Sequence, residues 1–147
     1  MDATTRASEE RRIRERIASW AKALRAKDLD GLLAHYARDF VSFDLAPPLR
    51  HGGEEVRRSL AEWFPTWDGP IGYELGELTV VAGDEVAFAH GLHRLHGKKT
   101  YGTTEDVWFR ATIGFRKTGG EWLVVHEHTS VPFYMDGSYR AAVDLAP

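Results

Sequence analysis

A single carboxylate, Asp44, stands at the end of an apolar stretch of the chain. It follows Phe40-Val41-Ser42-Phe43 and precedes Leu45 and the pair Pro47-Pro48. If this side chain faces inward, it loses hydration, and its pKa rises toward the range of a general base. The same residue could instead cap a turn at the surface. The sequence leaves both interpretations open, and the first makes Asp44 the candidate catalytic base.

The segment His126-Glu127-His128-Thr129-Ser130 is the second place where chemistry could reside. In a regular strand His126 and His128 point to the same face. Two imidazoles at this spacing can chelate zinc or iron, with Asp44 or His90 completing the site. No third ligand stands at a defined spacing, and the chain has no cysteine. We therefore expect no metal and no cofactor, with His126 or His128 acting as a proton relay or orienting group.

Arg110 is the third candidate, because it shares one face of an extended stretch with Trp108. An inward arginine beside an aromatic ring would stabilise an anionic or enolate-like ligand. The alternative is an ion pair at an interface, with Glu105, Asp106 or Glu127 as the partner.

Aromatic side chains suit the wall of an apolar pocket, although they also suit a plain core. His90 joins this group, because its strand carries the small residues Ala87, Ala89 and Gly91 on the opposite face. Small residues leave room for a ligand or for a tightly packed neighbour. The predicted lining comprises Trp20, Tyr36, Phe43, Trp63, Phe64, Trp67, His90 and Trp108.

The elements that must position these residues begin with helices. Helical spacing of apolar residues predicts a first helix over about Ser8–Lys27, with Ser8 as its cap. Asp28 can cap a short second helix that extends to Tyr36, and a short strand follows at Phe40–Asp44. Gly52-Gly53 opens a third helix, which Pro65 ends.

The remaining chain reads as strands separated by glycine-containing turns. The predicted strands cover Ile71–Val81, Glu85–His96, Thr103–Lys117 and Trp122–Val131, followed by a tail, Met135–Pro147, with little pattern. Helices followed by an antiparallel meander indicate an α+β fold. We expect a cone-shaped roll in which a strongly curved antiparallel sheet encloses a pocket.

Composition narrows the class of protein. The 147 residues fit a single domain, with a core over about 8–132 and a tail over 133–147, and the net charge is −3. This charge offers no basic surface for nucleic acid. The polar N-terminus and the absence of a long apolar run predict a soluble, cytoplasmic protein that does not enter a membrane.

The order of elements resembles the nuclear-transport-factor-2-like superfamily, and within it the SnoaL-like and ketosteroid-isomerase-like group. The stretch AHYARDFVSFDLAPPLRHGGEEVR and the closing W-x-x-x-H-x-H-x-S pattern carry the resemblance, which covers about Ser8 to Pro132. It implies the cone fold. The superfamily includes isomerases, cyclases, dehydratases, hydrolases and non-catalytic assembly domains, so it leaves the activity open.

Ketosteroid isomerases carry the pattern Y-A-D-D-A-x-x-x-D-P, in which the last Asp shuttles the proton. Tyr36–Asp44 matches this frame, so the resemblance implies that Asp44 is the base. Their oxyanion-hole tyrosine falls on Trp20, and their second acid falls near Trp108–Arg110, where no acid stands. A steroid isomerase is therefore not implied. Arg110, His90 or His126 would supply the electrophilic group instead.

The ending VVHEHTSVP also resembles the association domain of calcium/calmodulin-dependent kinases, which oligomerises and binds small acids without catalysis. We expect a homodimer, because the long strands carry apolar or amphipathic residues on both faces. The preferred hypothesis is an isomerase, cyclase or hydrolase acting by proton transfer on a hydrophobic carbonyl compound. The alternatives are a non-catalytic ligand-binding or oligomerisation domain and a metal site built on His126 and His128.

Overall fold

The computed structural model describes all residues 1–147, and it begins with a long helix, α1 (Ala3–Arg25). Asp2 caps this helix by accepting a hydrogen bond from the Thr5 amide at 2.7 Å. The helix therefore starts five residues before the predicted Ser8 cap. Ile13, Ile17 and Leu24 form its buried stripe. This stripe fixes which face of α1 meets the sheet.

Two short helices and an edge strand follow α1. Asp28 caps α2 (Leu29–Leu33), its carboxylate accepting from the Gly31 amide at 3.0 Å. Strand β1 (Tyr36–Phe43) begins four residues before the predicted strand, at Tyr36, which the prediction places at the end of the second helix. Helix α3 (Gly53–Trp63) then runs into a single 3-10 turn, η1 (Phe64–Thr66).

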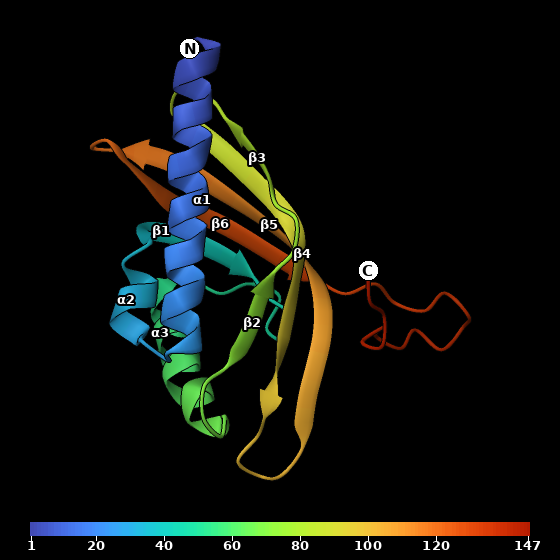
Figure 1. Cartoon of the computed structure of the whole chain (residues 1–147). Helices are drawn as coiled ribbons and strands as arrows, with labels where there is room; N and C mark the ends of the chain where they lie inside the picture. Colours follow the sequence, from blue (N-terminus) through green and yellow to red (C-terminus); the bar gives the residue numbers. More distant parts are fainter.

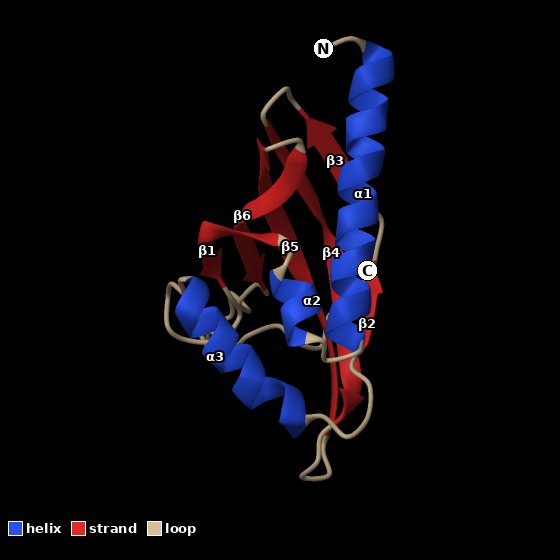
Figure 2. Ribbon diagram, turned by 90° about the vertical axis from the view of Figure 1, so that its left-hand side faces the viewer, coloured by secondary structure: helices blue, strands red, loops and turns tan.

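The rest of the chain adds five strands to β1 and completes a six-stranded sheet in the order β1-β6-β5-β4-β2, with β3 also paired to β4. These strands are β2 (Gly72–Leu75), β3 (Thr79–Ala82), β4 (Val86–Lys98), β5 (Thr104–Thr118) and β6 (Glu121–Ser130). The sheet is open, and the α+β fold class is confirmed. Figures 1 and 2 show that all three helices lie on the same face of the sheet.

Two features of the sheet differ from the prediction. The predicted strand Ile71–Val81 is divided into β2 and β3, which pair with different parts of β4. Gly76 lies at the break, where an added Cβ would sit 2.4 Å from the Leu92 carbonyl oxygen. In addition, β1 pairs with β6 in parallel, so the sheet is mixed. No hairpin joins β1 to β6, so no short turn dictates their relative direction.

A bulge in β6 sets which of its side chains face the helices. Phe115 pairs with Val124 and Gly114 pairs with His126, which leaves Val125 as an extra residue. One extra residue reverses the alternation of side chains beyond it. Trp122 and Val124 are buried on the inner face, and Glu127 takes that face after the bulge.

The hydrophobic core lies between α1 and the concave face of the sheet. At one end, Ile13 and Ile17 of α1 pack on Ala87 and Ala89 of β4 and on Trp122 of β6. At the other end, a second cluster surrounds Trp67, Ile71 and Phe109. The two clusters hold α1 along the sheet, with its C-terminal half beside the space that β1 and α3 enclose.

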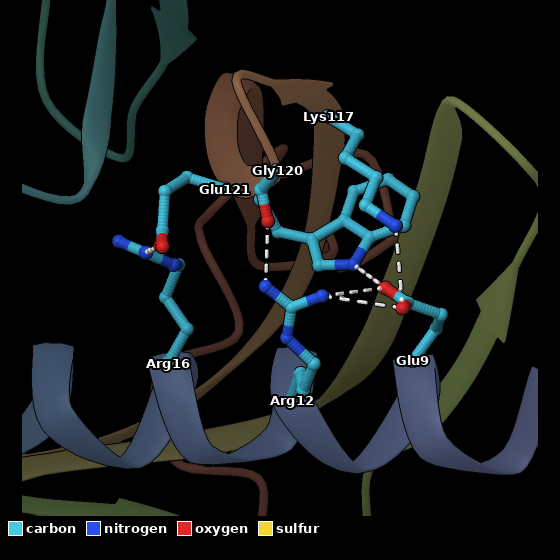
Figure 3. A network of polar contacts seen from close by, with 7 residues as sticks. Glu9, Arg12, Arg16, Lys117, Gly120 and Glu121 are labelled. Atoms are coloured by element: carbon cyan, nitrogen blue, oxygen red, sulfur yellow. Dashed lines mark hydrogen bonds and ion pairs between the residues drawn. The ribbon is translucent and has the colours of Figure 1, made fainter. Parts of the chain in front are cut away.

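Polar contacts attach the N-terminal half of α1 to the β5–β6 hairpin (Figure 3). The Glu9 carboxylate accepts hydrogen bonds from the Trp122 indole N–H and from Arg12, and it pairs with Lys117 at 3.2 Å. Arg12 also donates to the Gly120 carbonyl oxygen at 2.6 Å. We call Glu9, Arg12, Lys117 and Trp122 the α1 clamp.

The segment after β6 contains no helix or strand and lies on the side of the sheet away from the helices (Figure 1). An isolated bridge joins Phe133 to Ala141, and Ala142 is buried. None of the helices is both long enough and apolar enough to cross a lipid bilayer.

Candidate active site

A cavity of about 350 Å³ lies between the concave face of the sheet, the C-terminal half of α1, α3 and the loop after β1. Most of its wall is apolar or aromatic, with Trp20, Trp63 and Phe109 contributing rings. Polar side chains enter it from four strands of the sheet, β1, β2, β4 and β6. An apolar cavity with a few convergent polar groups is the common form of a small-molecule site.

Glu127 supplies one of the two carboxylates of the cavity wall, and Asp44 supplies the other. It lies on β6 just after the bulge and opposite Ile113 of β5. Burial raises the pKa of Glu127 to about 7, and the charge of Asp44 adds to the rise. Hydrogen bonds from Tyr36 and Ser42 oppose it by stabilising the ionised form. The carboxyl group can therefore gain or lose a proton near neutral pH.

A chain of hydrogen bonds fixes this carboxylate. The Trp20 indole N–H donates to the Tyr36 hydroxyl oxygen at 2.7 Å, and the Tyr36 hydroxyl donates to Glu127 Oε2 at 2.9 Å. Ser42 Oγ donates to Glu127 Oε1 at 3.4 Å. Burial raises the pKa of Tyr36 well above its ordinary value, so the phenol keeps its proton. Tyr36 is thus a permanent donor to Glu127.

Asp44 lies in the cavity wall but is itself exposed. Its Oδ1 accepts from the Leu45 amide at 2.7 Å and from Thr129 Oγ1 at 3.2 Å. The expectation of a desolvated Asp44 is therefore wrong, because the loop after β1 turns at this residue and leaves the carboxylate in contact with solvent. Its negative charge still acts on Glu127.

Tyr73 and His93 form a second polar pair in the wall. The Tyr73 hydroxyl and His93 Nδ1 are 2.7 Å apart. His93 is 1% exposed, and its Nε2 is buried without a hydrogen-bond partner. Tyr73 contacts Trp20 edge to face at 5.3 Å between ring centroids, which links this pair to the side of the cavity that holds Glu127. His51 Nε2 is also buried in the wall without a partner.

The two histidines predicted as proton relays do not reach the cavity. His126 Nδ1 lies 2.7 Å from the Val41 carbonyl oxygen, and His128 is exposed. The Phe43 ring is exposed and lies edge-on to both imidazoles, at 4.7 and 5.5 Å between centroids. The bulge at Val125 explains the difference, because it turns Glu127 inward in place of its histidine neighbours.

His90, Trp108 and Arg110 lie on the outer face of the sheet, around an open groove of about 880 Å³. Their neighbours along the strands, Ala89, Phe109 and Ala111, take the inner face. Of the small residues of β4, Ala87 and Ala89 belong to the core cluster that contains Ile13 and Ile17 of α1, and Gly91 lies against Glu77 and Leu78. Arg110 Nε donates to Ser130 Oγ at 3.1 Å and has no carboxylate partner.

The remaining aromatic predictions divide between wall and core. Trp20, Tyr36 and Trp63 line the cavity. Phe64 and Trp67 are buried beside it in the core, where the Lys99 ammonium sits 3.9 Å from the centroid of the Trp67 ring. No group of three or more His, Asp or Glu side chains comes together in a way that could hold a metal ion.

Sequence reasoning did not select Glu127, Tyr73 or His93 as site residues. The sequence indicates Glu127 only as an ion-pair partner of Arg110, because an unbroken alternation places it outside. His93 is buried next to Arg94, which is partly exposed, so the alternation along β4 could have identified it. The sequence gives a weaker indication of the inward position of Glu127, because no residue type marks the bulge that turns this residue inward.

A helical layer on a curved open sheet with an internal cavity defines the class of NTF2-like proteins. An NTF2-like protein from Pseudomonas putida KT2440 is 36% identical over 96% of this chain and 98% of its own, with a TM-score of 0.85. The model of the SnoaL-like domain matches residues 13–134. The chain belongs to the SnoaL-like domain family.

More distant solved structures share the fold alone. A ketosteroid isomerase-like protein from Erwinia carotovora atroseptica is 20% identical over 83% of this chain and 95% of its own, with a TM-score of 0.70. The association domain of the kinase CaMKII from C. elegans is 15% identical over 86% of this chain and 98% of its own, with a TM-score of 0.69. No curated protein matches the sequence.

Proposed function

We propose that this protein is a small enzyme of the isomerase, cyclase or hydrolase type, which moves a proton on a hydrophobic carbonyl compound. One observation carries the proposal: the cavity wall holds a carboxyl group, Glu127, whose pKa burial raises to about 7. A general acid or base works best when its pKa lies near the working pH. The fold family contains both catalytic and non-catalytic members, so the argument rests on this group.

In the proposed reaction, each part of the cavity wall has a separate role. The apolar wall binds the substrate and excludes water. Ionised Glu127 accepts a proton from a carbon next to the carbonyl group and returns it to another position. The Tyr36 hydroxyl, held by Trp20, keeps the carboxylate oriented through the reaction. Asp44 acts through its charge, which raises the pKa of Glu127 and strengthens it as a base.

Proton exchange tests this proposal without knowledge of the natural product. The protein is incubated in D₂O with bicyclic aryl ketones such as 2-acetylnaphthalene and 1-tetralone, and NMR follows the loss of the α-proton signals. The wild type should accelerate exchange. Glu127→Gln should lower the rate by about 10²–10⁴-fold, the usual effect of removing a general base.

Two variants make the test specific. Asp44→Asn should lower the rate less than Glu127→Gln, because Asp44 acts on the base and does not itself take the proton. Glu85→Gln is a matched control on an exposed turn residue and should leave exchange unchanged. Equal rates for Glu127→Gln and wild type would exclude Glu127 as the base. If no ketone exchanges but ketones raise the melting temperature, the binding-domain alternative is favoured.

Self-association is a second role that we propose, and the outer face of the sheet supports it. Val86, Phe88 and Leu92 of β4 are 65, 45 and 42% exposed there. Trp108 and Arg110 line the adjoining groove, which the C-terminal Pro147 also reaches. Contiguous exposed apolar side chains mark interaction surfaces. A second copy of the same chain would cover this face in a homodimer without blocking the cavity on the opposite side.

A further inference from the structure

The cavity holds one polar pair that the proton transfer does not use. We propose that Tyr73 and His93 form a second polar subsite, which binds a neutral oxygen of the ligand, such as a carbonyl or hydroxyl group. This inference rests on the proposed function only in taking the cavity as the ligand site. It adds a chemical requirement on the ligand that Glu127 does not impose.

The protonation states of Tyr73 and His93 determine whether the pair has a hydrogen-bond donor free for a ligand. Burial lowers the pKa of His93 to about 4, so the imidazole is neutral and only one ring nitrogen carries hydrogen. Burial also raises the pKa of Tyr73 well above its ordinary value, so the phenol stays protonated. The contact between the Tyr73 hydroxyl and His93 Nδ1 uses one of these two hydrogens. One donor is always left over.

The left-over donor has two positions. If Tyr73 donates to Nδ1, the free hydrogen is on His93 Nε2, which is buried without a partner. If His93 Nδ1 donates to Tyr73, the free hydrogen is on the Tyr73 hydroxyl and Nε2 is an acceptor. Both arrangements can receive a carbonyl oxygen, and the second can also serve a hydroxyl group. A buried donor without a partner is unfavourable, so a ligand oxygen that pairs with it is favoured.

The surroundings of the pair select against charge. His93 contacts Tyr73 and Phe109 edge to face, at 5.5 and 5.9 Å between ring centroids, and Leu95 also lines the cavity. No cationic side chain lines the cavity. A carboxylate bound there would lose its hydration without gaining a counter-ion. The subsite should therefore accept ketones, alcohols and amides and exclude anions.

Three probes of similar shape test the proposal by titration calorimetry: 2-acetylnaphthalene, its oxygen-free isostere 2-isopropenylnaphthalene, and the anion 2-naphthoate. The wild type should bind the ketone roughly tenfold more tightly than the isostere, the scale of one net hydrogen bond, and should bind the anion more weakly than the ketone. The double variant Tyr73→Phe, His93→Phe keeps the ring shapes and should bind ketone and isostere equally. Glu127→Gln should keep the preference for the ketone.

The outcomes separate this proposal from the proposed function. If exchange requires Glu127 but the ketone preference survives in the double variant, the subsite is wrong and the enzyme proposal stands. If the preference is lost in the double variant but no exchange occurs, the subsite stands alone. Should the double variant fail to fold, ¹⁵N-histidine NMR on wild type decides. The ring nitrogen signals of His93 should shift with the ketone and stay with the isostere, and no shift with the ketone would overturn the proposal.

Discussion

Glu127 links the chemistry of the site to the stability of the protein. Its pKa is about 7 in the folded protein and about 4.5 in the unfolded chain. The folded state therefore binds more protons between these values, and the free energy of unfolding falls as the pH rises from 4.5 to 7. A carboxylate in this largely apolar cavity thus costs stability at neutral pH.

We expect Glu127→Gln to be more stable than wild type at pH 8, by on the order of 1–3 kcal/mol. Gln stays neutral, so the cost of a charge in the cavity wall is removed. The difference should vanish below pH 4.5, where wild-type Glu127 is protonated in both states. Urea unfolding at pH 4 and pH 8 measures it. A variant that is less stable at pH 8 would contradict the raised pKa.

Tyr36 lowers the pKa of Glu127, whereas burial raises it. Its hydroxyl stabilises the ionised form of Glu127, so Tyr36→Phe should raise the pKa of Glu127 further. The pH profile of ketone exchange should then have its midpoint above that of wild type. The variant should also lose about 1–3 kcal/mol of stability, because the Trp20 indole N–H is left without its acceptor. A midpoint that stays in place would show that the hydrogen bond does not act on the base.

At the scale of elements, the α1 clamp holds the helix that carries Trp20. Contacts from Trp122, Lys117 and Arg12 hold the pKa of Glu9 below its ordinary value. Because the folded-state pKa is lowered, this stabilisation is present above the unfolded value of 4.5 and is lost as the pH falls through the folded value. The clamp and Glu127 therefore have opposite pH dependences.

Glu9→Ala should lower the free energy of unfolding at pH 7 by about 1–3 kcal/mol, since the Trp122 indole N–H loses its partner. Glu10→Ala, one residue further along the same helix, is the matched control and should change stability little. Thermal melts at pH 7 compare the two. Equal melting temperatures for both variants would show that the clamp contributes nothing.

Some features of the helices and strands can be predicted from the sequence, and others cannot. The helices, the hairpin turns and the α+β class follow from apolar spacing and glycine positions, and the structure confirms them. The placement of Trp20 in the wall follows from the same spacing, whereas Tyr36 is expected on the second helix and reaches the wall from β1. Glu127 could not be predicted, because the bulge depends on the pairing of β6 with β5. Arg110 and His90 were misplaced because alternation tells which residues share a face, but not which face meets the helices.

For the whole molecule, the outer face of the sheet predicts a homodimer. Phe88→Asp should weaken self-association by placing a charge in the middle of the exposed apolar surface, while ketone exchange in the cavity on the other face continues. Leu49→Asp, in an exposed loop, is the matched control. Sedimentation velocity at micromolar concentration measures the assembly. A wild-type protein that is only monomeric at this concentration would contradict the prediction.

The extra residue in β6 has a consequence for how this chain tolerates insertion and deletion. Removing Val125 would make Gly114 and His126 follow Phe115 and Val124 as regular neighbours, with Glu127 still on the inner face. A chain one residue shorter at this point would therefore present the same acid. In a sequence alignment of the two chains without a gap, a different residue of the shorter chain would be aligned with Glu127. The face of the sheet on which Glu127 lies determines whether it reaches the cavity, and its distance from Trp122 along the sequence is free to change by one residue.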